Sequence, residues 1–260
     1  MSENRIQGKR VLITGASAGI GAACARRLAE EGAGLALWAR RLDRLEGLAD
    51  EIARRHGRDV HIARVDIRNR EHVEAAAEEL LRHVGVPHVL LNNAGLAAGL
   101  APVQEGDPED WDVMVDTNVK GLLYATRALL PHMIEAGRGH VVNVGSTAGH
   151  TTYPRGNVYA ATKFAVRALT EGMNLDLSGT PLRVSSVDPG YVKTEFSLVR
   201  FQGDEERAEA VYRGFQPLSP EDVADAVAYV INAPEHVNVF DMVLLPTAQR
   251  NIYVVDREEG

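Results

Sequence analysis

The stretch VLITGASAGIG, residues 11–21, decides the fold of this chain of 260 residues. Its apolar start, VLIT, leads into Gly15, Gly19 and Gly21, and the helical pattern AACARRLAEEG follows. Glycines at a strand-to-helix turn allow a tight bend, a close approach of the backbone to a pyrophosphate, and close packing of the helix on the strand. The helix start offers unpaired N–H groups to anionic oxygens. We therefore predict a nucleotide-binding turn rather than an ordinary glycine-rich one, although its G-x-x-x-G-x-G spacing differs from the commoner GxGxxG.

Strand-like and helix-like segments alternate along the rest of the chain. Short runs rich in β-branched residues predict strands, and apolar residues at helical spacing predict helices between them. The expected strands are residues 9–14, 34–39, 60–65, 87–91, 139–145, 182–187 and 240–245. The expected helices are residues 19–31, 42–56, 69–84, 108–136, 156–178 and 219–232. This order predicts an α/β fold of the Rossmann type, with a doubly wound parallel sheet of about seven strands and helices on both faces.

Length and composition are those of one globular domain. The chain is 45% hydrophobic and 25% charged, which are ordinary values, so we expect a single domain over residues 1–260. Residues 191–218 interrupt the alternation with a long crossover that carries the charged insertion GDEERAEAVYRG. Because long loops in compact domains are usually functional, we interpret this crossover as a substrate lid.

Net charge and cysteine content indicate which partners and which cellular compartment to expect. The net charge is −8 and lysine or arginine never forms a long run, which argues against a nucleic-acid partner. The lone Cys24 excludes an internal disulfide and fits a reducing compartment. No apolar segment reaches the roughly 18 residues that span a bilayer. We therefore expect a cytoplasmic protein with no membrane partner.

Three polar side chains form a candidate catalytic group. Tyr159 and Lys163 stand four residues apart in NVYAATK, which places them on one helix face. Ser146, thirteen residues before the tyrosine, ends the apolar run VVNVGS. A phenol has a pKa of about 10, so a tyrosine that exchanges protons near neutral pH needs a neighbouring positive charge. The trio predicts a general acid, the cation that tunes it, and a hydrogen-bond donor for a carbonyl oxygen, although YxxxK alone also occurs on ordinary amphipathic helices.

Taken together, the motifs resemble the short-chain dehydrogenase/reductase family nearly from end to end. The matching motifs are TGASAGIG at 14–21, Asp66 after the third strand, NNAG at 92–95, Asn118 in DTNVKG, Ser146, YAATK at 159–163, and Pro189 with Gly190. Within that family the chain is most similar to the NADP-dependent serine and 3-hydroxy acid dehydrogenases, through LNNAGLAAGLAPV, NVGSTAGH, TEFSLVRFQGD and LSPEDVADAV.

This resemblance assigns roles to the candidate residues. It implies that Tyr159 protonates the substrate oxygen, to which Ser146 donates a hydrogen bond. Lys163 would lower the pKa of the tyrosine and hold the nicotinamide ribose. Asn118, a poor helix former in mid-helix, would hold a local irregularity and connect Lys163 through a water to proton donors. The implied cofactor contacts also include Gly15, Ser17, Gly19, Ile20, Gly21, Asn93, Ala94, Gly95, Pro189, Gly190, Val192 and Thr194.

The end of the second predicted strand favours NADP over NAD. Ala39 stands where an NAD-dependent enzyme would place a carboxylate, and Arg40 and Arg41 follow it. Guanidinium groups suit a 2′-phosphate, although both arginines could instead cap and solvate the next helix with Arg44. Asp66 would, by resemblance, bind the adenine amino group or cap the helix that starts near residue 69.

The resemblance also implies a substrate class. We expect hydride transfer between NADP and a small 3-hydroxy acid, such as serine or 3-hydroxypropionate, or its semialdehyde. The carboxylate calls for a cation, for which Arg200 is the first candidate, Arg155 the second and Lys193 the third, with Tyr191 lining the pocket. The alternatives are a reductase for a neutral or bulkier carbonyl compound and, least favoured, a non-catalytic NADP-binding regulator.

Assembly is a further expectation from the family. Its members commonly form tetramers through the helices that carry Asn118 and Tyr159, so we expect a homotetramer. The apolar stripe in AATKFAVRALTEGMNLDL suits such a contact, although the same stripe is needed to cover the sheet. We expect no metal site.

Overall fold

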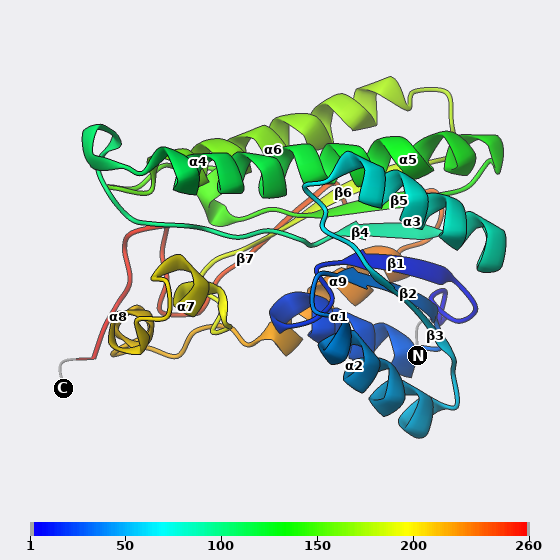
Figure 1. The fold of residues 1–260 in the computed structure, drawn as a ribbon, viewed down its shortest axis with the longest axis horizontal. Helices are drawn as coiled ribbons and strands as arrows, with labels where there is room; N and C mark the ends of the chain where they lie inside the picture. The colour runs from blue at the N-terminus through cyan, green and yellow to red at the C-terminus, as the bar shows by residue number, and fades with distance from the viewer. Residues whose placement is uncertain (1–2, 259–260) are drawn as a thin grey trace.

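Seven short strands form one parallel sheet in the computed structural model, which describes residues 3–258 (Figure 1). The strand order β3-β2-β1-β4-β5-β6-β7 reverses between β1 and β4, which is the doubly wound arrangement. The strands are β1 (Arg10–Thr14), β2 (Gly34–Ala39), β3 (Val60–Arg64), β4 (Val89–Asn92), β5 (His140–Val144), β6 (Arg183–Pro189) and β7 (Asp241–Leu244). All seven predicted strands are confirmed, and the fold class with them.

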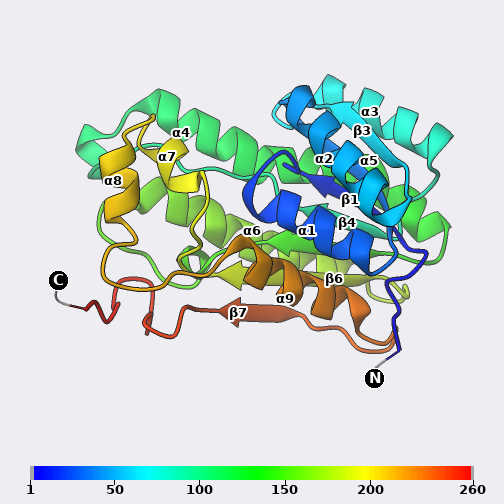
Figure 2. The same ribbon diagram turned by 90° about the horizontal axis from the view of Figure 1, so that it is seen from below.

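Helices cover both faces of the sheet, because the central strands are apolar on both sides (Figures 1 and 2). One layer consists of α1 (Gly19–Glu30), α2 (Leu42–His56) and α9 (Pro220–Asn232). The other consists of α3 (Arg70–His83), α4 (Pro108–Val115), α5 (Leu122–Glu135) and α6 (Asn157–Asp176). Each layer encloses its own hydrophobic core against the sheet. No helix within residues 3–258 is long and apolar enough to cross a membrane.

The helix predicted over residues 108–136 is not uniform. Between α4 and α5 the chain forms a π-helical segment, η2 (Asp116–Gly121), so the helix is continuous in direction but widened at one turn. Two short 3₁₀ turns, η1 (Val103–Glu105) and η3 (Thr147–Gly149), follow β4 and β5. These irregular segments all lie in connections that leave the carboxyl ends of strands.

The long crossover after β6 contains two short helices, α7 (Phe196–Arg200) and α8 (Glu205–Ala210). Both lie beyond the carboxyl ends of the strands, on the left of Figures 1 and 2. A hydrogen bond of 2.7 Å between the hydroxyl groups of Ser197 and Tyr212 joins α7 to the segment that follows α8. The parallel sheet thus brings the glycine turn, the catalytic candidates and the crossover to the same edge.

Candidate active site

The turn between β1 and α1 leaves the helix start open. Ala18 is the N-cap residue and has no side chain that accepts from the first N–H groups, and the first turn holds no acidic residue. Gly15 and Gly19 have φ angles of 67° and 52°, which other residues rarely adopt. A Cβ on Gly21 would lie 2.5 Å from Nδ2 of Asn93, so α1 packs tightly against the end of β4. An open helix start of this kind binds anions.

The NNAG segment after β4 holds this turn in place. The backbone N–H groups of Asn93 and Ala94 donate to Oγ1 of Thr14 at 3.1 and 3.0 Å. Nδ2 of Asn93 donates to the Thr14 carbonyl at 2.9 Å. Asn92 is buried and donates to Oδ1 of Asn143 at 3.0 Å, which links β4 to β5. The segment therefore supports both the sheet and the glycine turn.

A cleft of about 340 Å³ opens along the carboxyl ends of the strands. It brings together most of the cofactor and catalytic residues expected from the sequence. The expected residues that line it are Gly15, Ser17, Gly19, Ile20, Arg40, Arg41, Asp66, Asn93, Ala94, Gly95, Ser146, Tyr159, Lys163, Pro189, Gly190, Val192 and Thr194. Gly21 and Asn118 do not line the cleft. Gly21 packs against Asn93, and Asn118 bonds to the backbone of Leu96, and both Asn93 and Leu96 line it.

The positive edge beside β2 is connected to the long crossover. Nη1 of Arg41 lies 3.0 Å from Oε2 of Glu195, and Nη1 of Arg44 lies 2.7 Å from its Oε1. Nε and Nη2 of Arg41 also donate to Oγ of Ser17 at 3.3 and 3.2 Å. Arg40 lies exposed at the same edge. Glu195 was not among the residues expected from the sequence, although it stands in the stretch TEFSLVRFQGD.

Asp66 pairs with a neighbour and does not cap the following helix. Its Oδ2 lies 2.6 Å from Nη2 of Arg68, and this hydrogen bond holds the pKa of the Asp66 carboxyl below its usual value. The N-cap of α3 is Asn69, whose side chain accepts from the backbone N–H of His72 at 3.0 Å. The capping role considered for Asp66 is therefore wrong, because the residue at the cap position supplies its own acceptor.

Tyr159 and Ser146 meet at the cleft. Ser146 is the N-cap of η3, where its Oγ accepts from the Ala148 N–H at 3.1 Å. Burial raises the pKa of the Tyr159 phenol, while a hydrogen bond with Ser146 and the positive charge of Arg200 act to lower it. The ring of Phe196 packs edge-on against the phenol with centroids 5.5 Å apart. A substrate oxygen in this cleft has two hydroxyl groups within reach.

Lys163 is buried one helical turn after Tyr159. Its Nζ donates to the Val144 carbonyl at 2.9 Å, and burial lowers the pKa of the ammonium to about 8. We expected Lys163 to lower the pKa of Tyr159. That role stays a prediction: the lysine ammonium contacts the end of β5, and the charge of Arg200 also acts to lower the pKa of the phenol.

Asn118 stands in the π-helical segment η2, where a local irregularity was expected. Its Oδ1 accepts from the Leu96 N–H, and its Nδ2 donates to the Leu96 carbonyl, both at 2.8 Å. Nδ2 also donates to Oγ1 of Thr162 at 3.0 Å. The buried amide thus joins the loop after β4 to α6, beside Lys163.

Arg200 extends from α7 to the phenol ring. Its guanidinium carbon lies 5.3 Å from the ring centroid of Tyr159 and 5.9 Å from that of Phe196. It donates to the Tyr153 hydroxyl and, at 3.4 Å, to the Gly99 carbonyl. Within residues 3–258 its partners are neutral, so the positive charge is not balanced by a carboxylate. An anionic group beside the phenol would meet it.

The remaining substrate candidates lie elsewhere. Arg155 is exposed, adopts a φ of 65°, and lines a small pocket beside the cleft. Lys193 is exposed and pairs with Oε2 of Glu209 at 2.8 Å. The ring of Tyr191 packs edge-on against Phe215 with centroids 5.6 Å apart. Of these candidates, Arg200 has the contacts expected of a group that faces the substrate.

Comparison with known protein families identifies this arrangement. The family model of the short chain dehydrogenases matches residues 9–204. The chain belongs to the short-chain dehydrogenase family. The membership expected from the motifs is therefore confirmed.

Individual family members are similar over nearly the whole chain. The NADP-dependent 3-hydroxy acid dehydrogenase YdfG of Salmonella typhi is 46% identical over 240 residues, which cover 92% of this chain and 95% of that protein. Sulfoacetaldehyde reductase 2 of Chromohalobacter salexigens is 44% identical over 250 residues, 95% of this chain and 98% of that protein. The closed form of a serine dehydrogenase in complex with NADP+ superposes with a TM-score of 0.90 at 43% identity, over 96% of this chain and all of the other. The expected resemblance to the serine and 3-hydroxy acid dehydrogenases is confirmed.

Proposed function

We propose that this protein is an NADP-dependent oxidoreductase that transfers a hydride between the nicotinamide and a small 3-hydroxy acid, or the corresponding semialdehyde. Serine-like and 3-hydroxypropionate-like acids fit this class. The proposal is supported above all by the guanidinium of Arg200, which lies 5.3 Å from the centre of the Tyr159 ring and has no carboxylate partner within residues 3–258. The names of the similar proteins point to the same chemistry.

The cleft fits a dinucleotide that carries an extra phosphate. The uncapped start of α1 suits the pyrophosphate, and the edge formed by Arg40, Arg41 and Ser17 suits a 2′-phosphate. Pro189 and Gly190 would form the wall behind the nicotinamide. The bound nicotinamide supplies or accepts the hydride, and the protein supplies orientation and proton transfer.

The chain's own groups account for the remaining steps. In the direction of reduction, the Tyr159 hydroxyl donates a proton to the substrate oxygen, and Ser146 donates a hydrogen bond to it as negative charge develops. Arg200 holds the substrate carboxylate and orients the reacting carbon. Lys163 and Asn118 connect the phenol to proton donors. In the direction of oxidation the same groups act in reverse.

A substrate with a sulfonate group is a second candidate. A sulfonate carries the same charge as a carboxylate, and one similar protein is named a sulfoacetaldehyde reductase. A neutral aldehyde or ketone fits less well, because it would leave the guanidinium of Arg200 without an anionic partner beside three aromatic rings. The deciding experiment measures initial rates with NADPH and three aldehydes of similar size that carry a carboxylate, a sulfonate or no charge. Turnover confined to the neutral aldehyde would reject the proposal.

The edge beside β2 makes a prediction about cofactor choice. Arg41→Ala removes a guanidinium that would bind the 2′-phosphate, so the KM for NADP should rise by about 10- to 100-fold. The KM for NAD should change little, since NAD has no 2′-phosphate. Initial rates with both cofactors measure this, with Arg54→Ala on the exposed end of α2 as a matched control. An equal loss with NADP and NAD would contradict the assignment.

We propose that residues 191–218 form a lid on the single domain formed by residues 1–260. Phe196 and Arg200 of this segment contact the phenol ring of Tyr159. Glu195 of the same segment forms ion pairs with Arg41 and Arg44 beside β2. Closure of this segment would exclude water from the reacting atoms.

We also propose a homotetramer. Apolar side chains are exposed along α5 and α6, among them Leu123, Phe164 and Leu175 with 38%, 39% and 68% of their surface accessible. An apolar helix face of this kind suits a second copy of the chain. Sedimentation velocity at several concentrations should give a tetramer of about four times the 28.2 kDa chain mass. A persistent monomer would reject this proposal.

A further inference from the structure

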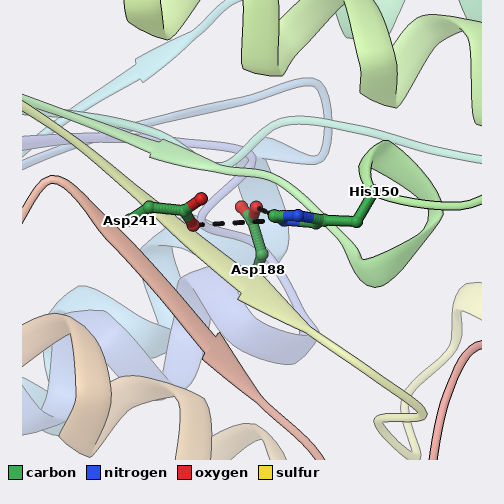
Figure 3. Close-up of side chains that lie close together, drawn as sticks. All are labelled: His150, Asp188 and Asp241. Atoms are coloured by element: carbon green, nitrogen blue, oxygen red, sulfur yellow. Dashed lines mark hydrogen bonds and ion pairs between the residues drawn. The ribbon is translucent and has the colours of Figure 1, made fainter.

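A buried carboxylate, that of Asp188, stands directly before Pro189, which lines the cleft. Asp188, at the end of β6, is 1% exposed. Figure 3 shows it between His150, from the loop after η3, and Asp241, from β7. Its Oδ2 lies 2.5 Å from Nε2 of His150, and its Oδ1 accepts a hydrogen bond from the Ser186 hydroxyl. An ionised carboxylate only accepts, so the His150 tautomer that fits it carries the proton on Nε2.

This carboxylate and the buried Lys163 both lie against the end of β5. Nζ of Lys163 donates to the Val144 carbonyl, and Gly145 is the next residue. A Cβ on Gly145 would overlap Oδ1 of Asp188, so the carboxylate occupies the space that a side chain would need. Ammonium and carboxylate therefore flank the same short stretch at the end of β5. The charge of Asp188 raises the pKa of Lys163, against the stronger effect of burial.

The cluster is joined by a direct hydrogen bond in this structure. Ligand atoms of His150, Asp188 and Asp241 lie within 4.8 Å of one another. Two ligands on one ion are each about 2.0 to 2.6 Å from it, which separates them from each other by about 3 Å or more. The 2.5 Å separation between His150 and Asp188 is a direct hydrogen bond, and Asp241 stands 4.0 Å from the same nitrogen.

We propose that Asp188 is a positioning residue that supplies the counter-charge of Lys163, and that His150 keeps this carboxylate ionised by donating a hydrogen bond to it. The proposal rests on the proposed roles of Tyr159 and Lys163. Without the counter-charge, a buried lysine loses its proton more readily, and the proton supply behind the phenol fails at a lower pH.

The surrounding charges support this direction of effect. Burial raises the pKa of Asp188 and so does Asp241, whereas the hydrogen bonds from Ser186 and His150 lower it. The charge of Asp188 also raises the pKa of Lys163 and that of Tyr159, which both stand on α6. Removing the charge lowers both pKa values, so it favours loss of the proton from each group. Activity that needs both protons is lost as pH rises through the lower of these pKa values.

The direct test is Asp188→Asn, followed by NMR of the lysine side chains. The chain has four lysines, so selective labelling with assignment through Lys163→Met gives a resolved signal. The pKa of Lys163, about 8 in the native protein, should fall by about 1 to 2 pH units in the variant. The alkaline limb of the NADPH-dependent reduction rate should move to lower pH by a similar amount. An unchanged titration of Lys163 would overturn the proposal.

A second pair of variants tests the part played by the histidine. His150→Gln keeps an N–H donor and should leave the Lys163 titration close to native. His150→Leu removes the donor, so the pKa of Asp188 should rise and that of Lys163 should fall, as in Asp188→Asn. Equal behaviour of the two His150 variants would overturn the role of the hydrogen bond. Since NMR titration needs no turnover, a wrong substrate or an inactive Tyr159 variant leaves this test intact.

Discussion

Replacing Tyr159 with phenylalanine should lower kcat by about 10²- to 10⁴-fold, the range expected for loss of a general acid. The ring itself packs edge-on against Phe196, 5.5 Å between centroids, and phenylalanine keeps that contact. The variant therefore loses the proton and the hydrogen bond with Ser146, and little else. Initial rates with NADPH and the best aldehyde substrate measure the effect.

Two measurements separate lost chemistry from lost structure. Thermal unfolding and quenching of protein fluorescence by NADPH should remain close to native in Tyr159→Phe. Tyr229→Phe is the matched control, because this tyrosine lies on α9 and is 65% exposed. If Tyr159→Phe kept native turnover, the proton would come from another group and the proposed mechanism would fail.

The fold was predictable because its signals are local in the sequence. Central strands such as residues 89–92 and 140–144 are buried on both faces, and their sequences VLLN and HVVNV are mostly apolar with no alternation of polar residues. The glycine turn marks the first strand–helix boundary by itself. The two short helices α7 and α8 were not predicted, since they have five and six residues and depend on tertiary contacts such as that between Ser197 and Tyr212.

The site was predictable only where a motif is local. Tyr159 and Lys163 stand four residues apart on α6, so helical spacing places them on one face, and Ser146 stands only thirteen residues before the tyrosine. The pairing of Arg41 with Glu195 joins residues 154 positions apart, and that of His150 with Asp188 joins residues 38 apart. In sequence these are ordinary charged residues, and the crossovers that unite them carry no pattern of their own. The direction of a long side chain such as Lys163 likewise depends on which carbonyl group lies nearby.

Replacing Arg200 with alanine should decide the substrate class. Loss of a charged hydrogen-bonding partner costs about 1.5 to 3 kcal/mol, so kcat/KM for a 3-hydroxy acid should fall by about 10- to 100-fold. Most of this loss should appear in KM, because the contact with the carboxylate exists before and after hydride transfer. A neutral alcohol of the same length should lose much less. Arg82→Ala is the matched control, since that arginine is exposed in the last turn of α3 and does not line the cleft.

A second effect of Arg200 has to be separated from the first. Its charge also lowers the pKa of Tyr159, so alanine would slow proton transfer for every substrate. Arg200→Lys keeps the positive charge but lacks the planar fork that binds a carboxylate through two hydrogen bonds. If the arginine binds substrate, lysine should restore the rate with the neutral alcohol but not the affinity for the hydroxy acid. Equal losses for both substrates in Arg200→Ala, fully restored by lysine, would instead make this residue a cation for the phenol and remove the main support for a hydroxy acid substrate.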